Sequence, residues 1–271
     1  SLTPSLIRRF LTYAREPHPT GRFGRNSITS QRQARPSTVN DYYRYLRAFT
    51  NWCLAEGLLQ QSPLKNVKAP RVPQDQLQPL SAEQCQALLD AARQTNEPER
   101  NRAIILLLLE TGLRLSEACS LTVGDANQST GEITVTGKGG KRRRVYLSSR
   151  NARRALRLYL DRCRPDAGDE EPLFVSERGG SSREALTPNA LALTVRRLAQ
   201  LAGLKGVACS PHYLRRTFAI NFLRAGGNLF TLQQLMGHEG LEVLRRYCAV
   251  AEADLEAAHR QASVTDRMRL Q

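Results

Sequence analysis

The chain has 271 residues, with 40 Lys and Arg against 25 Asp and Glu, and a formal net charge of +15. Such an excess favours a polyanionic partner, nucleic acid above all, although charge can also serve solubility alone. No apolar run is long enough to span a bilayer and we expect no signal peptide, which argues against membrane and secreted proteins. The six cysteines are scattered without a C-x-x-C pair, so neither a zinc site nor a disulfide framework is indicated.

The N-terminal part contains two predicted helices joined by a basic loop. Thr3–Ala14 has a capping threonine and a proline in its first turn, which suit the start of a helix. Residues 16–37 are rich in Gly, Pro, Ser, Gln and Arg, and indicate a surface loop that also suits contact with a nucleic-acid backbone. A long helix is predicted over Ser37–Ala55, where apolar residues recur at helical spacing and favour a core. Its interleaved Arg44 and Arg47 favour a DNA-facing side.

Residues 62–79 separate two parts of the chain. This stretch is punctuated by prolines, which is typical of an extended linker between domains. We therefore expect a helical domain at 1–75 and a second domain at 76–271. The helices expected in the second domain lie at 81–93, 101–111, 115–121, 151–163, 187–202, from 210 onward, and at 254–261.

A basic hairpin is predicted among those helices. The β-rich runs Ile133–Thr136 and Arg144–Leu147 flank the sequence GKGGK, which fits two strands joined by a turn. We expect Leu121–Val123 to add a third strand, so the chain is predicted to be mainly α with a small antiparallel β-sheet. Basic residues beside the turn suit contacts to DNA phosphates, which give affinity without sequence information. The hairpin residues expected to make them are Lys141, Arg142 and Arg143.

The stretch Ser210–Tyr247 concentrates residues suited to phosphate chemistry. His212 and Arg215 have an H-x-x-R spacing, and positions i and i+3 of a helix lie on one face. The glycine before His238 suits a helix end, which would place this histidine in a loop or at a helix start. Taken alone, an H-x-x-R spacing is usually part of a solvated helix face, and a single tyrosine is usually packed in a core. Together, a guanidinium, two imidazoles and the Tyr247 phenol around one point favour phosphate chemistry.

Two further motifs complete a family resemblance. TGLRLSEACSL places Arg114 after an apolar helix, and the hairpin turn carries Lys138. In this order the motifs resemble those of the tyrosine recombinase, or phage integrase, family, strongly over residues 80–271 and more weakly over 37–79. The resemblance implies a two-domain architecture, with a helical core-binding domain and a mixed α/β catalytic domain. It also implies more helices in the first domain than the two evident here, so we expect the first helices to be absent.

The resemblance assigns a role to each site residue. Arg114 and Arg215 would bind the nonbridging oxygens of the scissile phosphate, because planar guanidiniums suit phosphate. Tyr247 would attack phosphorus and form a 3′-phosphotyrosine, which conserves bond energy so that rejoining needs no ATP. Lys138 would protonate the leaving 5′-oxygen, with Lys141 as the fallback. His212 would assist proton transfer at the tyrosine, and His238 would donate a hydrogen bond to a nonbridging oxygen. Glu117 would orient a neighbouring side chain, with an ordinary helix ion pair as the alternative.

Three hypotheses remain open at this point. The first is a site-specific recombinase or integrase that works through a Holliday junction. The second is a type IB topoisomerase-like enzyme that relaxes DNA, and the third is a DNA-binding module without catalysis. The filled set of site residues argues against the third, and chain size and the GHxxL…Y form of the last motif disfavour the second. Tyr213 is a rival nucleophile, but it follows His212 on the same helix and so points about 100° away from it.

The implied partners are double-stranded DNA recombination sites and further copies of the chain. We expect a tetramer on DNA and a monomer when free. An apolar stripe of Leu255, Ala258 and Ala262 near the C-terminus is expected to dock on a neighbouring protomer, with packing on its own domain as the alternative. No carboxylate cluster suggests a metal, so neither metal nor cofactor is expected. The resemblance further implies a cytoplasmic, nucleoid-associated, prokaryotic protein. It is typical of a mobile genetic element, with chromosome resolution as the open alternative.

Overall fold

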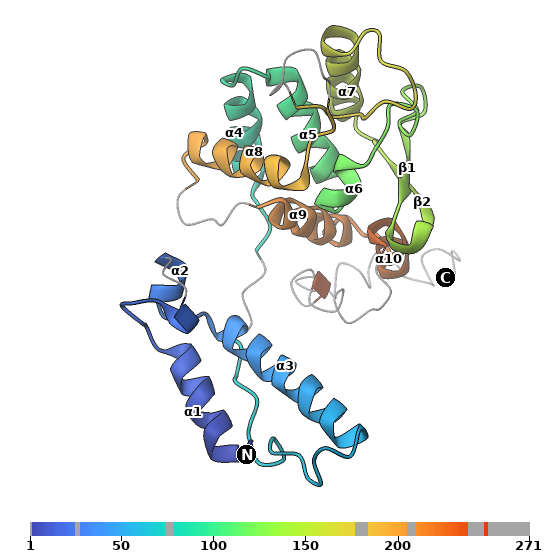
Figure 1. The fold of residues 1–271 in the computed structure, drawn as a ribbon. Coiled ribbons are helices and arrows are strands. Elements are labelled where there is room, and N and C mark those ends of the chain that lie inside the picture. Colours follow the sequence, from blue (N-terminus) through green and yellow to red (C-terminus); the bar gives the residue numbers. More distant parts are fainter. Residues whose placement is uncertain are drawn as a thin grey trace, which may run out of the picture. The chain divides into compact units, whose positions relative to one another are not determined.

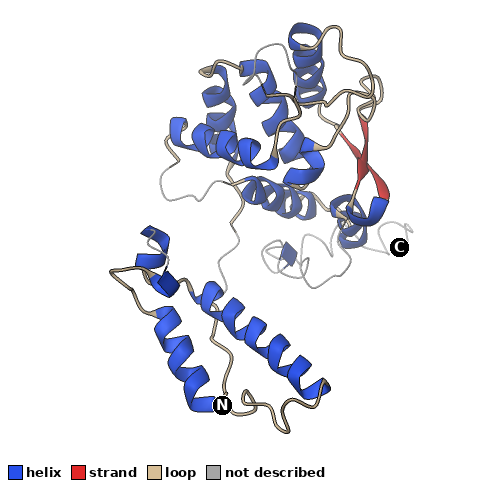
Figure 2. Cartoon of the chain, in the orientation of Figure 1, coloured by secondary structure: helices blue, strands red, loops and turns tan. Residues whose placement is uncertain are grey.

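The computed structural model describes residues 2–24, 28–73, 78–176, 184–204, 210–237 and 247–248. The chain divides into two compact units, Ser1–Gln76 and Leu77–Gln271, each taken by itself below (Figure 1). Helices dominate both units, and the described strands form one small antiparallel hairpin (Figure 2). The expected fold class, mainly α with a small antiparallel β-sheet, is confirmed.

The smaller unit is built on two packed helices with shorter elements between them. Its elements are α1 (Pro4–Arg15), η1 (Arg22–Gly24), α2 (Ile28–Gln31) and α3 (Pro36–Ala55). Thr3 caps α1, because its side chain accepts a hydrogen bond from the backbone N–H of Leu6 at 3.2 Å. α3 starts one residue before the expected Ser37, with Arg35 in the capping position. The buried apolar residues that join these elements are Ile7, Leu11, Val39, Tyr43, Leu64 and Val67.

The larger unit is arranged around one buried helix, α5. Its elements are α4 (Ala82–Arg93), α5 (Pro98–Thr111), α6 (Leu115–Cys119), β1 (Glu132–Thr136), η2 (Lys138–Gly140), β2 (Arg142–Tyr146), α7 (Arg150–Cys163), α8 (Pro188–Leu201), α9 (Pro211–Arg224) and α10 (Leu229–Met236). α5 packs against α4, α7 and α9. The apolar run Ile104–Leu108 is buried on most of its faces, with Leu106 only partly covered. A helix that is apolar nearly all round needs such neighbours on several sides.

The hairpin has two strands rather than three. β1 and β2 pair antiparallel, with Thr134 opposite Arg144. The expected third strand at Leu121–Val123 is wrong within the described part of the chain. The Leu121 carbonyl accepts from the backbone N–H of Leu173, and the Val123 N–H donates to the carbonyl of Glu171. Backbone polar groups need partners when they are buried, and this segment finds them outside the hairpin.

Gly112 joins the end of α5 to α9. It lies just past the last residue of α5 with a φ of 60°, in the left-handed region that favours glycine. A Cβ at this position would lie 2.3 Å from a ring carbon of Phe218 on α9. Any other residue would therefore push α9 away from the end of α5. This close approach fixes where the first turns of α9, with His212 and Arg215, stand.

Candidate active site

Arg114 opens α6 and has both protein contacts and exposure to solvent. Its backbone N–H donates to Glu117 Oε2 at 2.8 Å, so the carboxylate caps the helix from its third position. The Arg114 guanidinium donates to Glu117 Oε1 and to the Gly237 carbonyl, both at 2.9 Å. Its side chain remains 41% exposed. The guanidinium is therefore oriented by the protein while still open to a ligand.

Arg215 is the buried cation of the site. It lies on α9, and its guanidinium donates to the carbonyls of Gly112 and Met236, the latter at 2.7 Å. Burial and the charge of Arg114 bring the pKa of Arg215 down to about 10, against a smaller opposite effect of Glu117. Arg215 therefore stays cationic at neutral pH even inside the protein.

Arg143 lies on β2 but points inward. Its guanidinium makes a two-pronged ion pair with Glu117, at 2.9 Å from Nη1 to Oε1 and 2.7 Å from Nη2 to Oε2. Its Nε donates to the Leu235 carbonyl at 2.8 Å. The side chain is 14% exposed, whereas that of Arg144, the next residue, is 69% exposed. The expectation that Arg143 contacts a DNA phosphate is at odds with these protein partners, because strand alternation turns it to the covered side.

The three arginines converge on the last turn of α10. The final carbonyls of a helix have no partner within the helix, and cationic side chains stabilise them. Here three consecutive carbonyls each accept from a different guanidinium. The pairs are Leu235 with Arg143, Met236 with Arg215, and Gly237 with Arg114. The end of α10 is thus the common anchor of the site, and Gly237 is the residue before His238.

Glu117 supplies the negative charge inside this cluster. Burial alone would raise its pKa, but hydrogen bonds from Arg143 and Arg114 and the charge of Arg143 outweigh it and bring the pKa to about 2. The carboxylate is therefore ionised at any physiological pH. These four residues contain three guanidinium groups and one carboxylate, which binds two of them, Arg114 and Arg143. The cluster therefore keeps excess positive charge.

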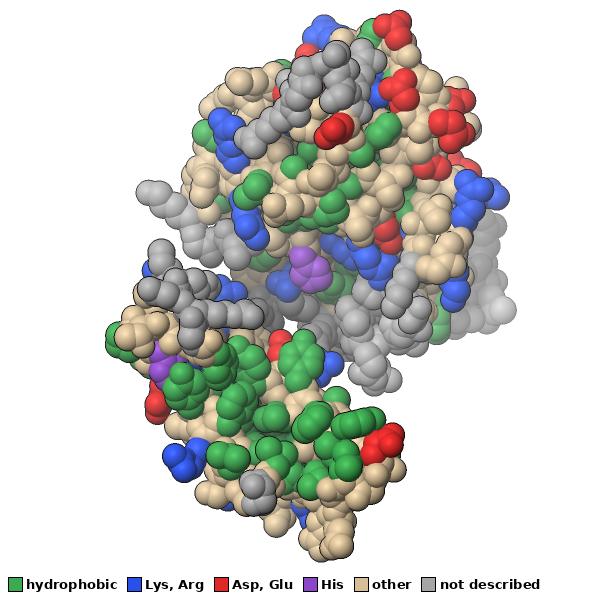
Figure 3. Space-filling model, viewed as in Figure 1, with side chains coloured by type: hydrophobic (Ala, Val, Ile, Leu, Met, Phe, Trp, Pro, Cys, Tyr) green, Lys and Arg blue, Asp and Glu red, His purple; other side chains and the backbone are tan. Residues whose placement is uncertain are grey.

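His212 lies on the first turn of α9 and is exposed to solvent. Partial burial, followed by the charges of Arg216 and Arg215, lowers the pKa of His212 below its ordinary value of 6.5. The imidazole is therefore neutral at pH 7 and able to accept a proton. Figure 3 shows a histidine on the larger unit beside a group of lysine and arginine side chains. Next to it in sequence, Tyr213 is half-buried, with the guanidinium carbon of Arg216 5.4 Å from its ring centre.

Tyr247 is brought to the same region but is covered. It is 3% exposed and belongs to a small apolar cluster with residues of α9 and α10. The other buried members are Ala219, Ile220, Leu232 and Met236. The charge of the Tyr247 phenolate acts to raise the pKa of Arg215, so the two side chains are within electrostatic reach. Tyr247 therefore packs with Met236, the residue whose carbonyl accepts a hydrogen bond from Arg215.

The structure describes the remaining expected site residues to different extents. Lys138 begins η2 at the tip of the hairpin, and only its backbone is described. His238 and the tail 249–271 lie outside the described residues. Lys141 and Arg142 are exposed beside the hairpin tip. In the smaller unit, Arg44 and Arg47 are both exposed on α3, as their expected DNA-facing role requires.

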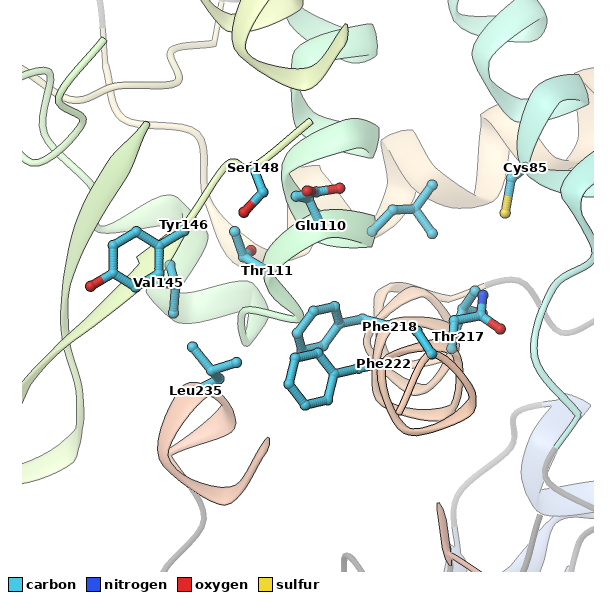
Figure 4. Close-up of a pocket in the computed structure, with 13 residues that line it drawn as sticks. Cys85, Glu110, Thr111, Val145, Tyr146, Ser148, Thr217, Phe218, Phe222 and Leu235 are labelled. Carbon is cyan, nitrogen blue, oxygen red and sulfur yellow. The ribbon is translucent and has the colours of Figure 1, made fainter. Parts of the chain in front are cut away.

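A separate apolar cleft of about 540 Å³ lies on the larger unit (Figure 4). It is lined mainly by uncharged side chains, including Phe218 and Phe222 from α9 and Val145 from β2. Among the residues that the structure describes, Glu110 is the only acidic one in its lining, and neither Arg114 nor Arg215 lines it. The cleft therefore lacks the charge that distinguishes the arginine cluster.

Sequence reasoning missed the role of Arg143. The basic run 141–144 looks uniform, so we expected phosphate contacts along it. The signal was the alternation of the strand, which places Arg143 on the same side as the buried Val145.

Among the described residues no group of three His, Cys, Asp or Glu is arranged to hold a metal ion. No helix in the described ranges is long and apolar enough to cross a membrane.

Comparison with known proteins identifies the class. Residues 78–254 match the model of the phage integrase family. Tyrosine recombinase XerD of Xanthomonas axonopodis pv. citri (strain 306) is 34% identical over 225 residues, covering 79% of this chain and 72% of the relative. XerD of Pseudomonas aeruginosa (strain PAO1) is 35% identical over 219 residues, covering 79% and 71%.

Solved structures agree with the fold. The crystal structure of XerA recombinase has a TM-score of 0.56 and 25% identity, covering 99% of this chain and 84% of that one. A post-cleavage complex of XerH with the palindromic difH substrate has a TM-score of 0.68 and 22% identity, covering 97% and 72%. The chain belongs to the phage integrase family, the tyrosine recombinases. It is accordingly a site-specific recombinase, an enzyme that acts on DNA.

Proposed function

We propose that this enzyme cleaves and rejoins DNA strands at recombination sites through a 3′-phosphotyrosine at Tyr247 and then a Holliday junction, without metal or ATP. The observation that carries the proposal is the convergence of Arg114, Arg143 and Arg215 on the end of α10, where Arg114 and Arg143 also bind Glu117. This cluster has excess positive charge where Arg114 is open to solvent. A DNA phosphodiester supplies the complementary negative charge.

Arg114 and Arg215 are the groups proposed to bind the scissile phosphate. The pentacovalent transition state places more negative charge on the nonbridging oxygens than the ground state does. Charged donors that are held in place before the reaction stabilise that developing charge most effectively. Arg215 is held by the carbonyls of Gly112 and Met236, and Arg114 by Glu117 and Gly237. His238 is proposed to add a hydrogen bond to a nonbridging oxygen, as the family resemblance implies.

Tyr247 is the proposed nucleophile and His212 the group that takes its proton. The lowered pKa of His212 keeps its imidazole neutral at pH 7, which is the form that accepts a proton. Tyr247 packs with Met236, whose carbonyl accepts a hydrogen bond from Arg215. Because Tyr247 is 3% exposed, its phenol must become accessible before it can attack DNA.

Lys138 is the proposed acid for the leaving group. When the phenol oxygen bonds to phosphorus, the bond from phosphorus to the 5′-oxygen breaks and that oxygen needs a proton. An ammonium group at the tip of the hairpin is able to donate it. The backbone of Lys138 begins η2 at this tip. Lys141, exposed three residues further on, is the fallback donor.

Double-stranded DNA is the proposed partner of both parts of the chain. Residues 76–271 would form the catalytic domain and residues 1–75 the DNA-binding domain. Lys141 and Arg142 of the hairpin, with Arg44 and Arg47 of α3, are exposed and suit contacts to the phosphate backbone. Recombination exchanges four strands, so we propose a tetramer on two DNA sites. The similar XerH structure is a complex with its difH substrate, which supports this choice of partner.

A covalent-capture experiment tests the proposal and finds the DNA site in the same step. A library of nicked duplexes with randomised sequence is incubated with the full chain, and DNA that stays attached to protein after denaturation is sequenced. The wild type is expected to enrich one family of sites, and EDTA is expected to leave capture unchanged. Tyr247→Phe keeps the ring and lacks the nucleophile, so it is expected to bind the enriched duplex and form no adduct.

The outcomes separate the competing functions. An adduct with the Phe variant would assign attack to another residue, Tyr213 being the first to test. A metal requirement for capture would refute the metal-free mechanism. Relaxation of supercoiled DNA without the enriched site would favour a topoisomerase-like activity, whereas strand exchange between two enriched duplexes is the expected result.

A further inference from the structure

Arg143 connects three parts of the site that are far apart in sequence. It belongs to β2. Its guanidinium donates two hydrogen bonds to the Glu117 carboxylate on α6, and its Nε donates to the Leu235 carbonyl on α10. A two-pronged pairing of this kind fixes the direction of a guanidinium as well as its distance. One side chain thus joins the hairpin, the helix opened by Arg114, and the helix that ends before His238.

The Arg143 guanidinium also packs on two glycines. A Cβ on Gly237 would lie 3.0 Å from Arg143 Nη1 and 3.1 Å from its Cζ, tighter than ordinary packing. A Cβ on Gly137 would lie 3.6 Å from the same Nη1. Gly137 directly precedes Lys138, and Gly237 directly precedes His238. The guanidinium therefore faces the glycine that precedes each of these two predicted site residues.

We infer that Arg143 is a positioning residue for strand cleavage. It sets the hairpin that carries Lys138 at a fixed place relative to Glu117 and the phosphate-binding Arg114. This inference rests on the proposed role of Lys138 as the proton donor to the leaving oxygen. Ile133, Val135 and Val145 hold the hairpin in the core. Arg143 pairs with Val135, two residues closer to the tip than Val145, and adds polar contacts to α6 and α10 at that end.

Burial separates this role from a phosphate contact. The Arg143 side chain is 14% exposed, whereas its neighbours Arg142 and Arg144 are exposed on the other side of the strand. A guanidinium shared between a carboxylate and a carbonyl stays bound to protein when DNA arrives. Losing Arg143 should therefore change the chemistry of cleavage more than the affinity for DNA.

The test compares two leaving groups on the duplex enriched in the capture experiment. One substrate has the ordinary 5′-oxygen at the scissile position and the other has a 5′-bridging sulfur. A thiol is far more acidic than an alcohol, so sulfur leaves as a thiolate without a proton donor. Single-turnover adduct formation is measured at saturating DNA for the wild type, R143K and R114A. Lysine keeps a charge for Glu117 but lacks the planar fork.

R143K is expected to slow cleavage of the oxygen substrate by about 100-fold, the size of effect that misplacing a catalytic group by about 1 Å produces. With the sulfur substrate most of that loss should disappear. R114A should be slow on both substrates, because it removes a contact to the phosphate itself. An equal loss for R143K on both substrates would overturn the inference, since Arg143 would then act on the phosphate site or on folding.

Affinity provides the second arm. R142Q removes an exposed charge from the same strand and should lower the slope of log affinity against log salt by about one. R143Q should leave this slope unchanged. If R143Q instead lowers the slope as R142Q does, Arg143 is a phosphate contact. If R143Q does not fold, the two-substrate comparison with R143K decides alone. A wild type that forms no adduct on either substrate refutes the proposed function rather than this inference.

Discussion

The exposed face of α3 and the buried arginine cluster of the larger unit use arginine in opposite ways. On α3 of the smaller unit, Arg44 has a side chain 75% exposed, and its 3.5 Å pair with Asp41 is a surface contact of the kind that contributes little. In the larger unit, Arg215 is buried and its guanidinium is bound to two backbone carbonyls. Both residues count equally in the net charge. Only the second is fixed in place, which is what stabilising a transition state requires.

The aromatic residues of α3 extend the contrast. Tyr45, Phe49 and Trp52 are exposed, although their helical spacing would suit a core. In α5 the apolar residues are buried and hold the helix ends that carry the site. These side chains of α3 present a surface, whereas the core of the larger unit supports the candidate site from inside. Substitutions of exposed basic residues, in either unit, should accordingly affect binding, and substitutions in the buried arginine cluster should affect chemistry.

Arg215→Ala should have the largest effect that tests this contrast. It removes a charged donor that we propose stabilises the transition state, so single-turnover cleavage at saturating DNA should fall by about 10²–10³-fold, or about 3–4 kcal/mol. It should also destabilise the larger unit, because the carbonyls of Gly112 and Met236 lose their donor. Arg114→Ala is the comparison variant. It should lower the cleavage rate by a similar factor and lower the free energy of unfolding by less. Equal unfolding midpoints for the two variants would contradict the buried anchor.

Glu117 should make stability depend on pH in the acid range. Its folded pKa of about 2 lies below the ordinary value of 4.5, so its stabilising contribution is present above pH 4.5. That contribution is lost as the pH falls from 4.5 toward 2, because the unfolded chain binds the proton first. Glu117→Gln should lower the free energy of unfolding by on the order of 3 kcal/mol at pH 6.

Urea denaturation of the wild type and Glu117→Gln, followed from pH 6 to pH 3, measures this difference. The gap between the two proteins should narrow as the pH falls. Glu170→Gln is the control, since Glu170 is an exposed carboxyl of the same unit. A gap that stays constant with pH would mean that Glu117 contributes by packing rather than by charge.

Arg44→Gln and Arg47→Gln should have the smallest effects. Each removes an exposed charge from α3, so each should lower the salt slope of DNA binding by about one and weaken binding to all sequences alike. Binding titrations at several salt concentrations, on the enriched duplex and on an unrelated one, measure both quantities. A loss confined to the enriched duplex would indicate base contacts from this helix instead.

Local pattern was sufficient for much of this protein. The helical spacing of apolar residues predicted the main helices, and the GKGGK turn between β-rich runs predicted the hairpin. These features depend on neighbours in sequence, so the sequence expresses them directly. The family followed from the order of the motifs around Arg114, Lys138, His212 and Tyr247, and the match over residues 78–254 confirms it.

Tertiary structure decided the features that depend on distant partners. Leu121–Val123 looked like a third strand because β propensity is local, but its hydrogen-bond partners proved to be residues 171–173. Arg143 looked like its basic neighbours because charge is a property of the residue alone. Its direction is set by Glu117, 26 positions away, and by Leu235, 92 positions away. Burial and partner choice depend on how elements pack, and a linear pattern of charges does not contain that information.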